Sequence, residues 1–390
     1  MVQTEHLWLR GVLWLPAHNV PFVTQPRLPQ SARKTAPLCS EFRAHATRRR
    51  RIEIRSSSEN FTLIQLRCLS AFAACLTVLS SAPALAQAFP NKPLKWIVPF
   101  PPGGPTDGLS RAIAQKLAES IGQPVVIENR GGAGGGVGMD ALAKSAPDGY
   151  TIGLSTTGTH AINPALYGAK LPYDPLKDFT HLTLGVVYVN ILVINANHPA
   201  KSLTELISFA KANPGKVSFG SAGNGSSNHL SGEILKTLTG APMQHIPYKG
   251  SAPALTDVLA GNITFMYDIL NTSLPHVRSG RVRALAVTGT QRTPFAPEVP
   301  TTEEAGVKGY AEAGSDLWMG ISAPSGIPKP IADKLNTELI KVLRSPELRE
   351  RIRGQSFDLW TSTPAEFTAV IKSDLAKWSK IVKASGARID

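Results

Sequence analysis

From residue 94 onward the chain alternates between short apolar runs and apolar residues spaced three or four apart. Residues 96–98 form such a run, which predicts a buried strand, and Leu109, Ile113 and Leu117 recur every fourth position, which predicts one buried face of a helix. The further predicted strands are 124–129, 150–154, 186–195, 216–219, 265–268, 283–288 and 317–321. Strands that alternate with helices in this way indicate an α/β fold.

The predicted helices have recognisable ends. One follows a glycine-rich stretch near residues 139–145, one opens at Ser202 with capping-box spacing to Glu205, and one places Leu230, Ile234, Leu235 and Leu238 on one face. Helices dominate the end of the chain, at 331–343, 346–353 and 364–384, the last opening with the capping box of Thr363 and Glu366. We expect Trp360 and Trp378 to lie in the core.

The first 88 residues differ from the rest. Residues 1–62 are rich in Arg and Pro without a sustained period, which is typical of a non-native or disordered extension, with a basic nucleic-acid arm as the alternative. Residues 63–88 have a basic start, a short apolar core and small residues, which predict a secretory signal cleaved after Ala86 or Ala88. The mature chain would then begin near Phe89 and be secreted.

The charge and the cysteine content limit the kinds of reaction and binding site that the chain can support. The net charge is +13, of which residues 1–88 contribute +7, so the remainder has only a modest positive excess. All three cysteines lie in that first segment, which leaves residues 89–390 without a thiol nucleophile, a disulfide or a cysteine-bound metal. The glycine run at 131–138 lacks the G-x-G-x-x-G spacing and no P-loop follows, so no cofactor is predicted. We interpret this run as a close backbone crossing.

Three stretches repeat one arrangement, in which a strand leads through a glycine- or serine-rich turn into the start of a helix. They are residues 99–107, 220–229 and 245–251, and a polar loop at 155–160 ends another strand. Backbone N–H groups at a helix start bind anions without a charged side chain. The central hypothesis is therefore that these turns hold a small carboxylate.

Several segments together resemble the Bug family, the TctC-like substrate-binding receptors of tripartite tricarboxylate transporters. They are the loop at 99–107, Glu128-Asn129-Arg130 with the glycine run, 146–150, 171–175, 225–230, 247–250 and 285–288, and the resemblance runs from about Phe89 to the C-terminus. It implies a two-domain periplasmic binding protein of the Venus-flytrap type, with mixed sheets and flanking helices. Domain 1 would comprise 89–190 plus 319–390 and domain 2 would comprise 191–318.

The resemblance also implies that facing loops hold the ligand mainly through backbone amides and water. The candidate ligand-binding residues are Gly103, Gly104, Asp107, Thr156, Thr157, Asn224, Gly225, Ser226, Ser227, Lys249, Gly250 and Asp268. Ordinary structural roles remain alternatives for several of these residues. Asp107, Ser226 and Ser227 could be helix caps, Lys249 a solvated surface lysine, and Asp268 a residue that forms hydrogen bonds within its loop. No metal site and no nucleic-acid partner are expected. The protein is expected to be a monomer that delivers its ligand to a membrane permease.

A secreted hydrolase is the alternative reading. Ser226 and His229, with Asp257 or Asp268, supply the residue types of a catalytic triad. The G-x-S-x-G motif is missing, and Ser226 and His229 fall on one helical turn, which favours capping over a nucleophile–base pair. The sequence therefore favours binding without chemistry.

Overall fold

The computed structural model describes residues 89–312 and 317–389. The expected extension at 1–62, the signal at 63–88 and both cleavage positions lie outside these residues. Among the described helices, none is long and apolar enough to cross a membrane.

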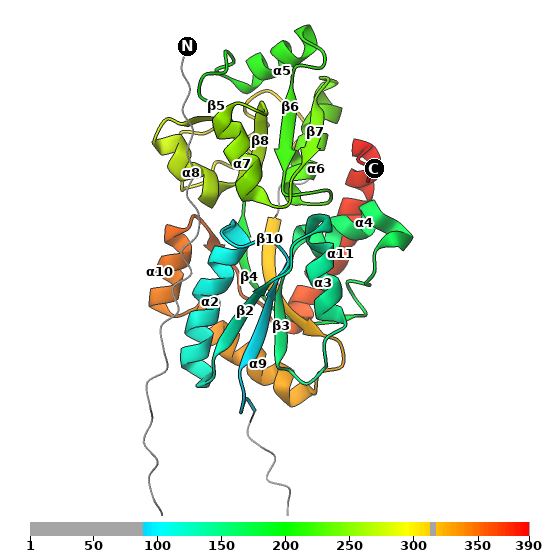
Figure 1. The fold of residues 1–390 in the computed structure, drawn as a ribbon, viewed down its shortest axis with the longest axis vertical. Coiled ribbons are helices and arrows are strands. Elements are labelled where there is room, and N and C mark those ends of the chain that lie inside the picture. The colour runs from blue at the N-terminus through cyan, green and yellow to red at the C-terminus, as the bar shows by residue number, and fades with distance from the viewer. Residues whose placement is uncertain (1–88, 313–316, 390) are drawn as a thin grey trace, which may run out of the picture. The chain divides into compact units, whose positions relative to one another are not determined.

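The first sheet has six strands, which cross it in the order β11-β4-β10-β3-β1-β2 (Figure 1). Their bounds are β1 (Leu94–Val98), β2 (Val125–Asn129), β3 (Thr151–Thr156), β4 (Phe179–Tyr188), β10 (Leu317–Pro324) and β11 (Asp358–Leu359). β1 is parallel to β2 and β3, whereas β10 is antiparallel to β3 and β4. We call the part of the chain built on this sheet the first lobe.

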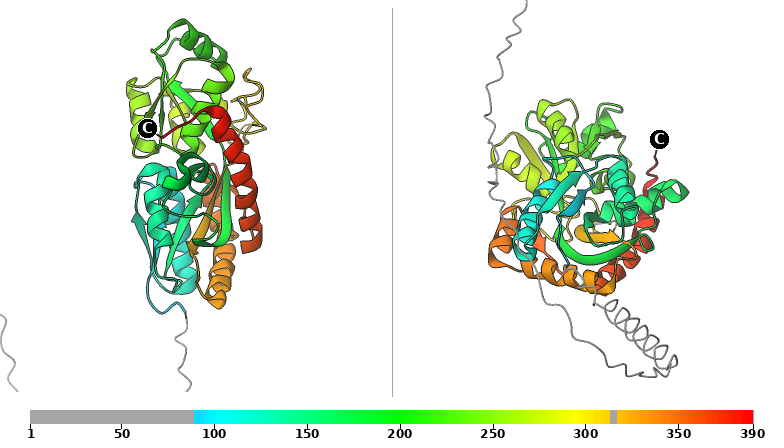
Figure 2. Two further views of the ribbon diagram at one scale, coloured as in Figure 1. Left: turned by 90° about the vertical axis from the view of Figure 1, so that its right-hand side faces the viewer. Right: turned by 60° about the horizontal axis from the view of Figure 1, so that its bottom comes forward.

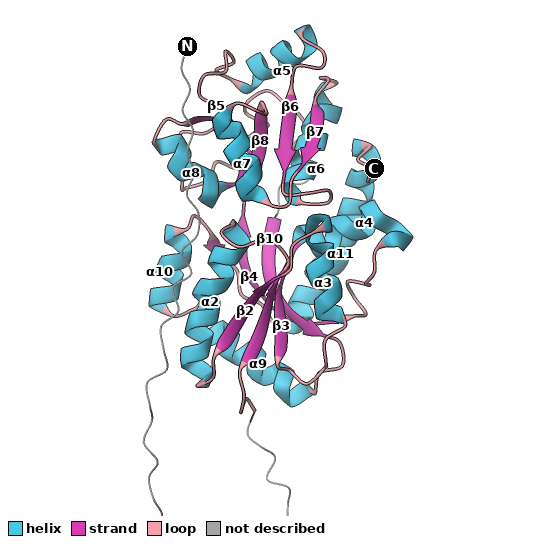
Figure 3. Ribbon diagram, in the orientation of Figure 1, coloured by secondary structure: helices cyan, strands magenta, loops and turns pink. Residues whose placement is uncertain are grey.

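The second sheet has five strands in the order β7-β6-β8-β5-β9 (Figure 3). Their bounds are β5 (Asn190–Asn195), β6 (Ser218–Ser221), β7 (Gln244–Pro247), β8 (Phe265–Ile269) and β9 (Val282–Val287). β6 is parallel to β7 and β8, and β5 is antiparallel to β8 and β9. The part built on this sheet is the second lobe, and both sheets are mixed, as expected.

Helices flank both sheets, which confirms the α/β class with mixed sheets (Figure 3). The helices are α2 (Pro105–Ile121), η1 (Ala133–Gly135), α3 (Gly136–Ala143), η2 (Gly158–Ile162), α4 (Asn163–Tyr167), η3 (Gly168–Lys170), α5 (Leu203–Ala212), α6 (Ser227–Thr239), α7 (Ser251–Ala260), α8 (Leu270–Arg278), α9 (Lys329–Leu343), α10 (Pro346–Gly354) and α11 (Pro364–Ser385). The predicted face of α2 is buried, with Leu109, Ile113 and Leu117 fully covered.

The chain crosses between the lobes at Val189. The single strand expected over 186–195 is wrong, because Tyr188 pairs with Leu317 in the first sheet and Asn190 pairs with Ile269 in the second. Both sheets are buried at this point, so apolar residues stand on both sides of the crossing, and the one polar residue beside it, Asn190, is itself buried. The chain returns to the first sheet between β9 and β10.

The last helix joins the lobes. The capping box that opens α11 is confirmed, with Thr363 accepting from the Glu366 N–H and the Glu366 carboxylate accepting from the Thr363 N–H. α11 runs along both lobes (Figure 2) and contacts β4 of the first and α6 of the second. At α6 the Thr237 hydroxyl donates to the Ser385 carbonyl at 2.8 Å.

Leu238 and Trp360 are exposed, and for Trp360 this contradicts the core position expected from the sequence. Leu238 is 43% exposed and lines a groove between α6 and α11, because it lies near the end of α6, past the buried stretch that ends at Leu235. Trp360 is 37% exposed, since it follows β11, a two-residue strand at the edge of the first sheet. Trp378 is buried in α11, as expected.

Candidate functional site

A small cavity of about 30 Å³ lies between the lobes, which we call the inner cavity. It is lined by Phe100, Pro105, Thr106, Thr156, Gly158, Tyr188 and Met319 from the first lobe and by Ala222, Ser226, Ser227, Asn228, Ser251 and Ile269 from the second. This volume corresponds to roughly one water molecule in the liquid. Among the described residues no charged side chain lines it.

Three helices begin at the inner cavity. Pro105 and Thr106 open α2, Ser227 and Asn228 open α6, and Ser251 opens α7. The first N–H groups of a helix have no acceptor within it and carry the positive end of its dipole. The cavity is therefore suited to an anion although its walls are uncharged.

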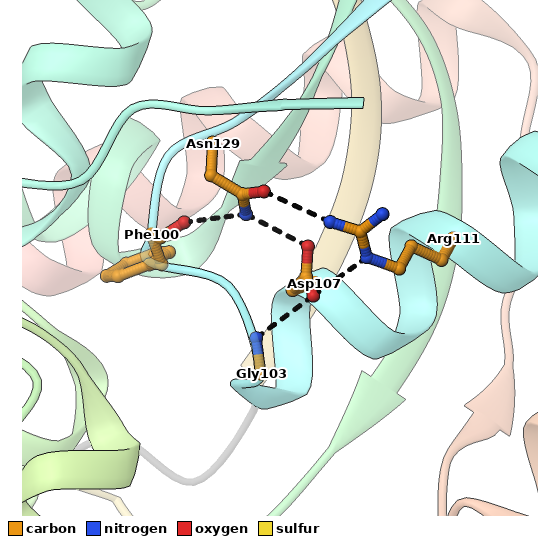
Figure 4. Close-up of polar contacts among 5 residues, drawn as sticks. All are labelled: Phe100, Gly103, Asp107, Arg111 and Asn129. Carbon is orange, nitrogen blue, oxygen red and sulfur yellow. Dashed lines mark hydrogen bonds and ion pairs between the residues drawn. The ribbon is translucent and has the colours of Figure 1, made fainter. Parts of the chain in front are cut away.

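The loop before α2 is held by the carboxylate of Asp107 (Figure 4). Asp107 accepts from the Gly103 N–H at 3.0 Å, from Arg111 Nε at 2.9 Å and from Asn129 Nδ2 at 2.9 Å, and Asn129 Nδ2 also donates to the Phe100 carbonyl. Burial alone would raise the pKa of Asp107, but these hydrogen bonds outweigh it and hold the pKa below its ordinary value. Asp107 thus orders the loop and occupies the Gly103 N–H.

The loop before α6 is held by uncharged groups. Ser226 Oγ accepts from the His229 N–H at 3.3 Å and donates to the Gly223 carbonyl at 2.7 Å, and His229 Nδ1 accepts from the Gly225 N–H at 3.2 Å. The His229 ring stacks on His245, with ring centroids 4.0 Å apart. Burial lowers the pKa of His229 to about 3, so its imidazole is neutral. Ser226 is a helix cap, and its hydroxyl bonds to backbone rather than to the imidazole.

Asp268 lies behind the inner cavity. It is fully buried at the end of β8, where it accepts from the hydroxyls of Ser251, Thr272 (2.5 Å) and Ser273 (2.7 Å). Desolvation raises the pKa of Asp268. Its carboxylate therefore holds Ser251 at the start of α7, and its bonds run within the second lobe.

The other predicted site residues lie in different places. Thr156 lines the inner cavity, whereas the hydroxyl of Thr157 turns to β10 and accepts from the Trp318 N–H at 2.9 Å. Asn224 and Lys249 line a second, outer cavity of about 230 Å³. The remaining three, Gly104, Gly225 and Gly250, line neither of these two cavities.

The outer cavity adjoins the inner one, since Phe100 and Ala222 line both. Lys249 is exposed there, and its ammonium has no hydrogen bond or ion pair with the described part of the chain. The Tyr167 hydroxyl, also in this cavity, donates across the lobes to the Asn224 carbonyl at 3.2 Å.

The glycine run at 131–138 does form a close backbone crossing. A Cβ placed on Gly134, at φ +56°, would lie 2.1 Å from the carbonyl oxygen of Asn224 in the other lobe. Only glycine permits the two loops to approach this closely.

Two residues that line the inner cavity are not predicted as site residues from the sequence. Thr106 is 4% exposed, and its hydroxyl has no hydrogen-bond partner among the described residues. Tyr188 is buried at the end of β4, where its hydroxyl lies 3.3 Å from Ser227 Oγ. The position of Thr106 in the first turn of α2 was a usable signal, whereas the role of Tyr188 depends on the crossing at Val189.

Two mixed sheets joined by two crossings, with a cavity at facing helix starts, define a two-lobed periplasmic binding protein. The family model described as "Tripartite tricarboxylate transporter family receptor" (TctC) matches residues 109–387. The chain belongs to this family.

Similar proteins agree with this assignment. BugT of Bordetella pertussis is 37% identical over 309 residues, covering 79% of this chain and 94% of BugT. The structure of periplasmic binding protein BugD is 34% identical with a TM-score of 0.73, covering 77% of this chain and 99% of BugD.

Two similar structures hold ligands. One is a protein from R. palustris with adipate, 36% identical with a TM-score of 0.73, covering 77% of this chain and all of that protein. The other is MatC from Rhodopseudomonas palustris with bound malate, 32% identical with a TM-score of 0.71, covering 75% of this chain and all of MatC.

Proposed function

We propose that this protein is a solute-binding receptor that encloses one carboxylate group of a small ligand in the inner cavity. One observation carries the proposal: α2, α6 and α7 all begin at an uncharged cavity between the lobes. Helix starts stabilise an anion most strongly where water is excluded and the effective dielectric is low. Adipate and malate, the ligands of the two similar structures, are both carboxylates.

The remainder of the ligand would extend into the outer cavity. The inner cavity of about 30 Å³ leaves no room beyond the anchored carboxylate, and the outer cavity of about 230 Å³ is its neighbour. Lys249 is exposed there, without a partner among the described residues, and offers its ammonium to a second anionic or hydrogen-bonding group. Entry of a ligand requires the lobes to separate, because Tyr167 and Tyr188 both bond across them.

The ligand would be bound without being transformed. The hydroxyl of Ser226 is used by Gly223 and the His229 N–H, and His229 Nδ1 is used by Gly225, so neither is arranged as nucleophile or base. A hydrolase assay that showed turnover lost on Ser226→Ala would contradict this part of the proposal.

The cellular setting follows from the family and the sequence. The similar BugD is a periplasmic binding protein, and residues 63–88 have the pattern of a cleavable signal. The receptor would therefore work in the periplasm as a monomer and hand its ligand to a membrane permease. Its lobes would correspond to the two domains expected from the sequence, 89–190 with 319–390 and 191–318, except that Asn190 belongs to the second sheet and Leu317 and Trp318 to the first.

Calorimetry of the chain beginning at Phe89 tests the binding proposal with a panel of mono-, di- and tricarboxylates. Gly104 lines neither cavity but is the N-cap residue of α2, next to the cavity-lining Pro105. A Cβ there meets only the Pro101 carbonyl oxygen at 3.8 Å, so Gly104→Val should fold. We expect it to block backbone approach and reduce affinity at least about 100-fold, or about 2.7 kcal/mol.

Gly108→Ala is the matched control for that variant. Its Cβ would meet nothing within 4 Å, and it lies inside α2, so it should keep the affinity and raise helix stability slightly. Unchanged affinity in Gly104→Val would overturn the placement of the site at the start of α2.

A further inference from the structure

The inner cavity has a neighbour on its hinge side as well. A groove of about 650 Å³, which we call the hinge groove, is lined by residues 187–189 at the crossing, by 289–295 of the second lobe, and by 356 and 358–360 of the first. Tyr188 lines both this groove and the inner cavity. One side chain therefore stands between a cavity the size of a water molecule and a much larger space.

The side chain of Tyr188 is fixed at both of its ends. Its hydroxyl reaches Ser227 Oγ at 3.3 Å on the cavity side. Its ring meets Phe357 edge-on, with centroids 6.3 Å apart and planes at 90°, and Phe357 lies between two residues that line the hinge groove. The residue is 6% exposed. A ring held in this way is a wall rather than a flexible flap.

We propose that Tyr188 sets ligand specificity by closing the hinge side of the inner cavity, so that branched carbon next to the anchored carboxylate is excluded. The inference rests on the proposed function. Tyr188 does not line the outer cavity, so an unbranched chain that extended past Phe100 and Ala222 into that cavity would leave its ring behind. A methyl branch beside the carboxylate would meet the phenol ring, and closely packed sites do not yield to added methyl groups cheaply.

The test measures affinity with matched probes. Wild-type protein is titrated by calorimetry with unbranched dicarboxylates of four to eight carbons, and then with the 2,2-dimethyl derivative of the tightest binder. We expect the dimethyl compound to bind at least about tenfold more weakly. If no member of the mono-, di- and tricarboxylate panel bound the wild-type protein, the proposed function itself would fail, and this inference with it.

Variants separate the ring from the hydroxyl. Tyr188→Leu removes the wall and should bring the two probes to within about threefold of each other. Tyr188→Phe keeps the ring and should retain the wild-type ratio, although it loses the bond to Ser227. Thermal melts check folding, and Tyr188→Met gives the same comparison if the leucine variant does not fold.

Tyr167→Leu is the control for lobe closure. It loses the other tyrosine bond across the lobes but borders only the outer cavity, so it should change affinities without changing their ratio. A Tyr188→Leu variant that kept the wild-type ratio, or a Tyr167→Leu variant that lowered it equally, would overturn the inference.

Discussion

The two loops that lead into α2 and α6 have the same plan but are held by opposite means. The loop before α2 depends on the ionised carboxylate of Asp107 and its partners Arg111 and Asn129. The loop before α6 depends on a serine cap and a neutral imidazole. The start of α2 therefore already has a negative charge beside it, whereas the start of α6 has none, and a ligand carboxylate should gain more from the second lobe.

Lowering the pH should affect the contributions of the two loops to stability differently, and this is the largest effect that we expect. Burial lowers the pKa of His229 to about 3 and that of His181 to about 4, against 6.5 unfolded. Below pH 6.5 the unfolded chain therefore binds protons that the folded chain does not, and stability falls as the pH falls. Between pH 6.5 and 4 we expect a loss of about 3 kcal/mol from His229 alone, measured by urea unfolding.

The control for the acid experiment is the other loop. Asp107 has a lowered pKa, so its contribution is present above about pH 4 and is lost only below that. His229→Asn should flatten the slope between pH 6.5 and 4, and Asp107→Asn should leave it unchanged. Equal slopes in all three proteins would show that His229 is not the titrating group.

Removing the charged network is the next largest effect. Asp107→Ala leaves the Gly103 N–H and Arg111 without their shared acceptor, so we expect a loss of about 2 kcal/mol of unfolding free energy. Arg111 is half exposed, which limits the part due to the ion pair. Arg111→Gln should therefore cost much less than Asp107→Ala in the same denaturant titration, and equal costs would contradict this picture.

The smallest effect concerns a single hydroxyl. Thr106 Oγ1 is buried at the inner cavity without a partner among the described residues, so Thr106→Val should leave the melting temperature unchanged or raise it slightly. Ligand affinity should fall about tenfold, because the carboxylate loses one donor. Thr256→Val, which alters an exposed hydroxyl of α7 bonded to its own helix, is the control and should not affect binding.

Local features of the sequence were sufficient for most of the fold. Strand runs, helix caps such as Thr363 and Ser202, and the glycine-rich turns each depend on neighbours a few positions away, and the structure has them. The break between β4 and β5, inside the single strand expected over 186–195, was missed, because apolar residues suit both sheets. Helix α8 was also missed, since Pro275 inside it argues against a helix.

The site was predictable only in outline. Facing turns at helix starts were expected, and Thr156, Ser226 and Ser227 do meet at the inner cavity. The sequence predicts that Asp268 contacts a ligand. It does not reveal that three hydroxyls already bind its carboxylate, because these lie 4, 5 and 17 positions away in the sequence. Tyr188 acquires its role from Phe357 and Ser227, which are distant in sequence, so no local pattern contains it.

The contact between Gly134 and the Asn224 carbonyl has one more consequence. A single methyl group at position 134 has nowhere to go while the two loops touch, and it would act as a wedge at the mouth of the ligand site. The identity of this residue is thus dictated by a surface some ninety positions further along the chain. Substitution of Gly134 alone would therefore give a receptor whose two lobes cannot close fully.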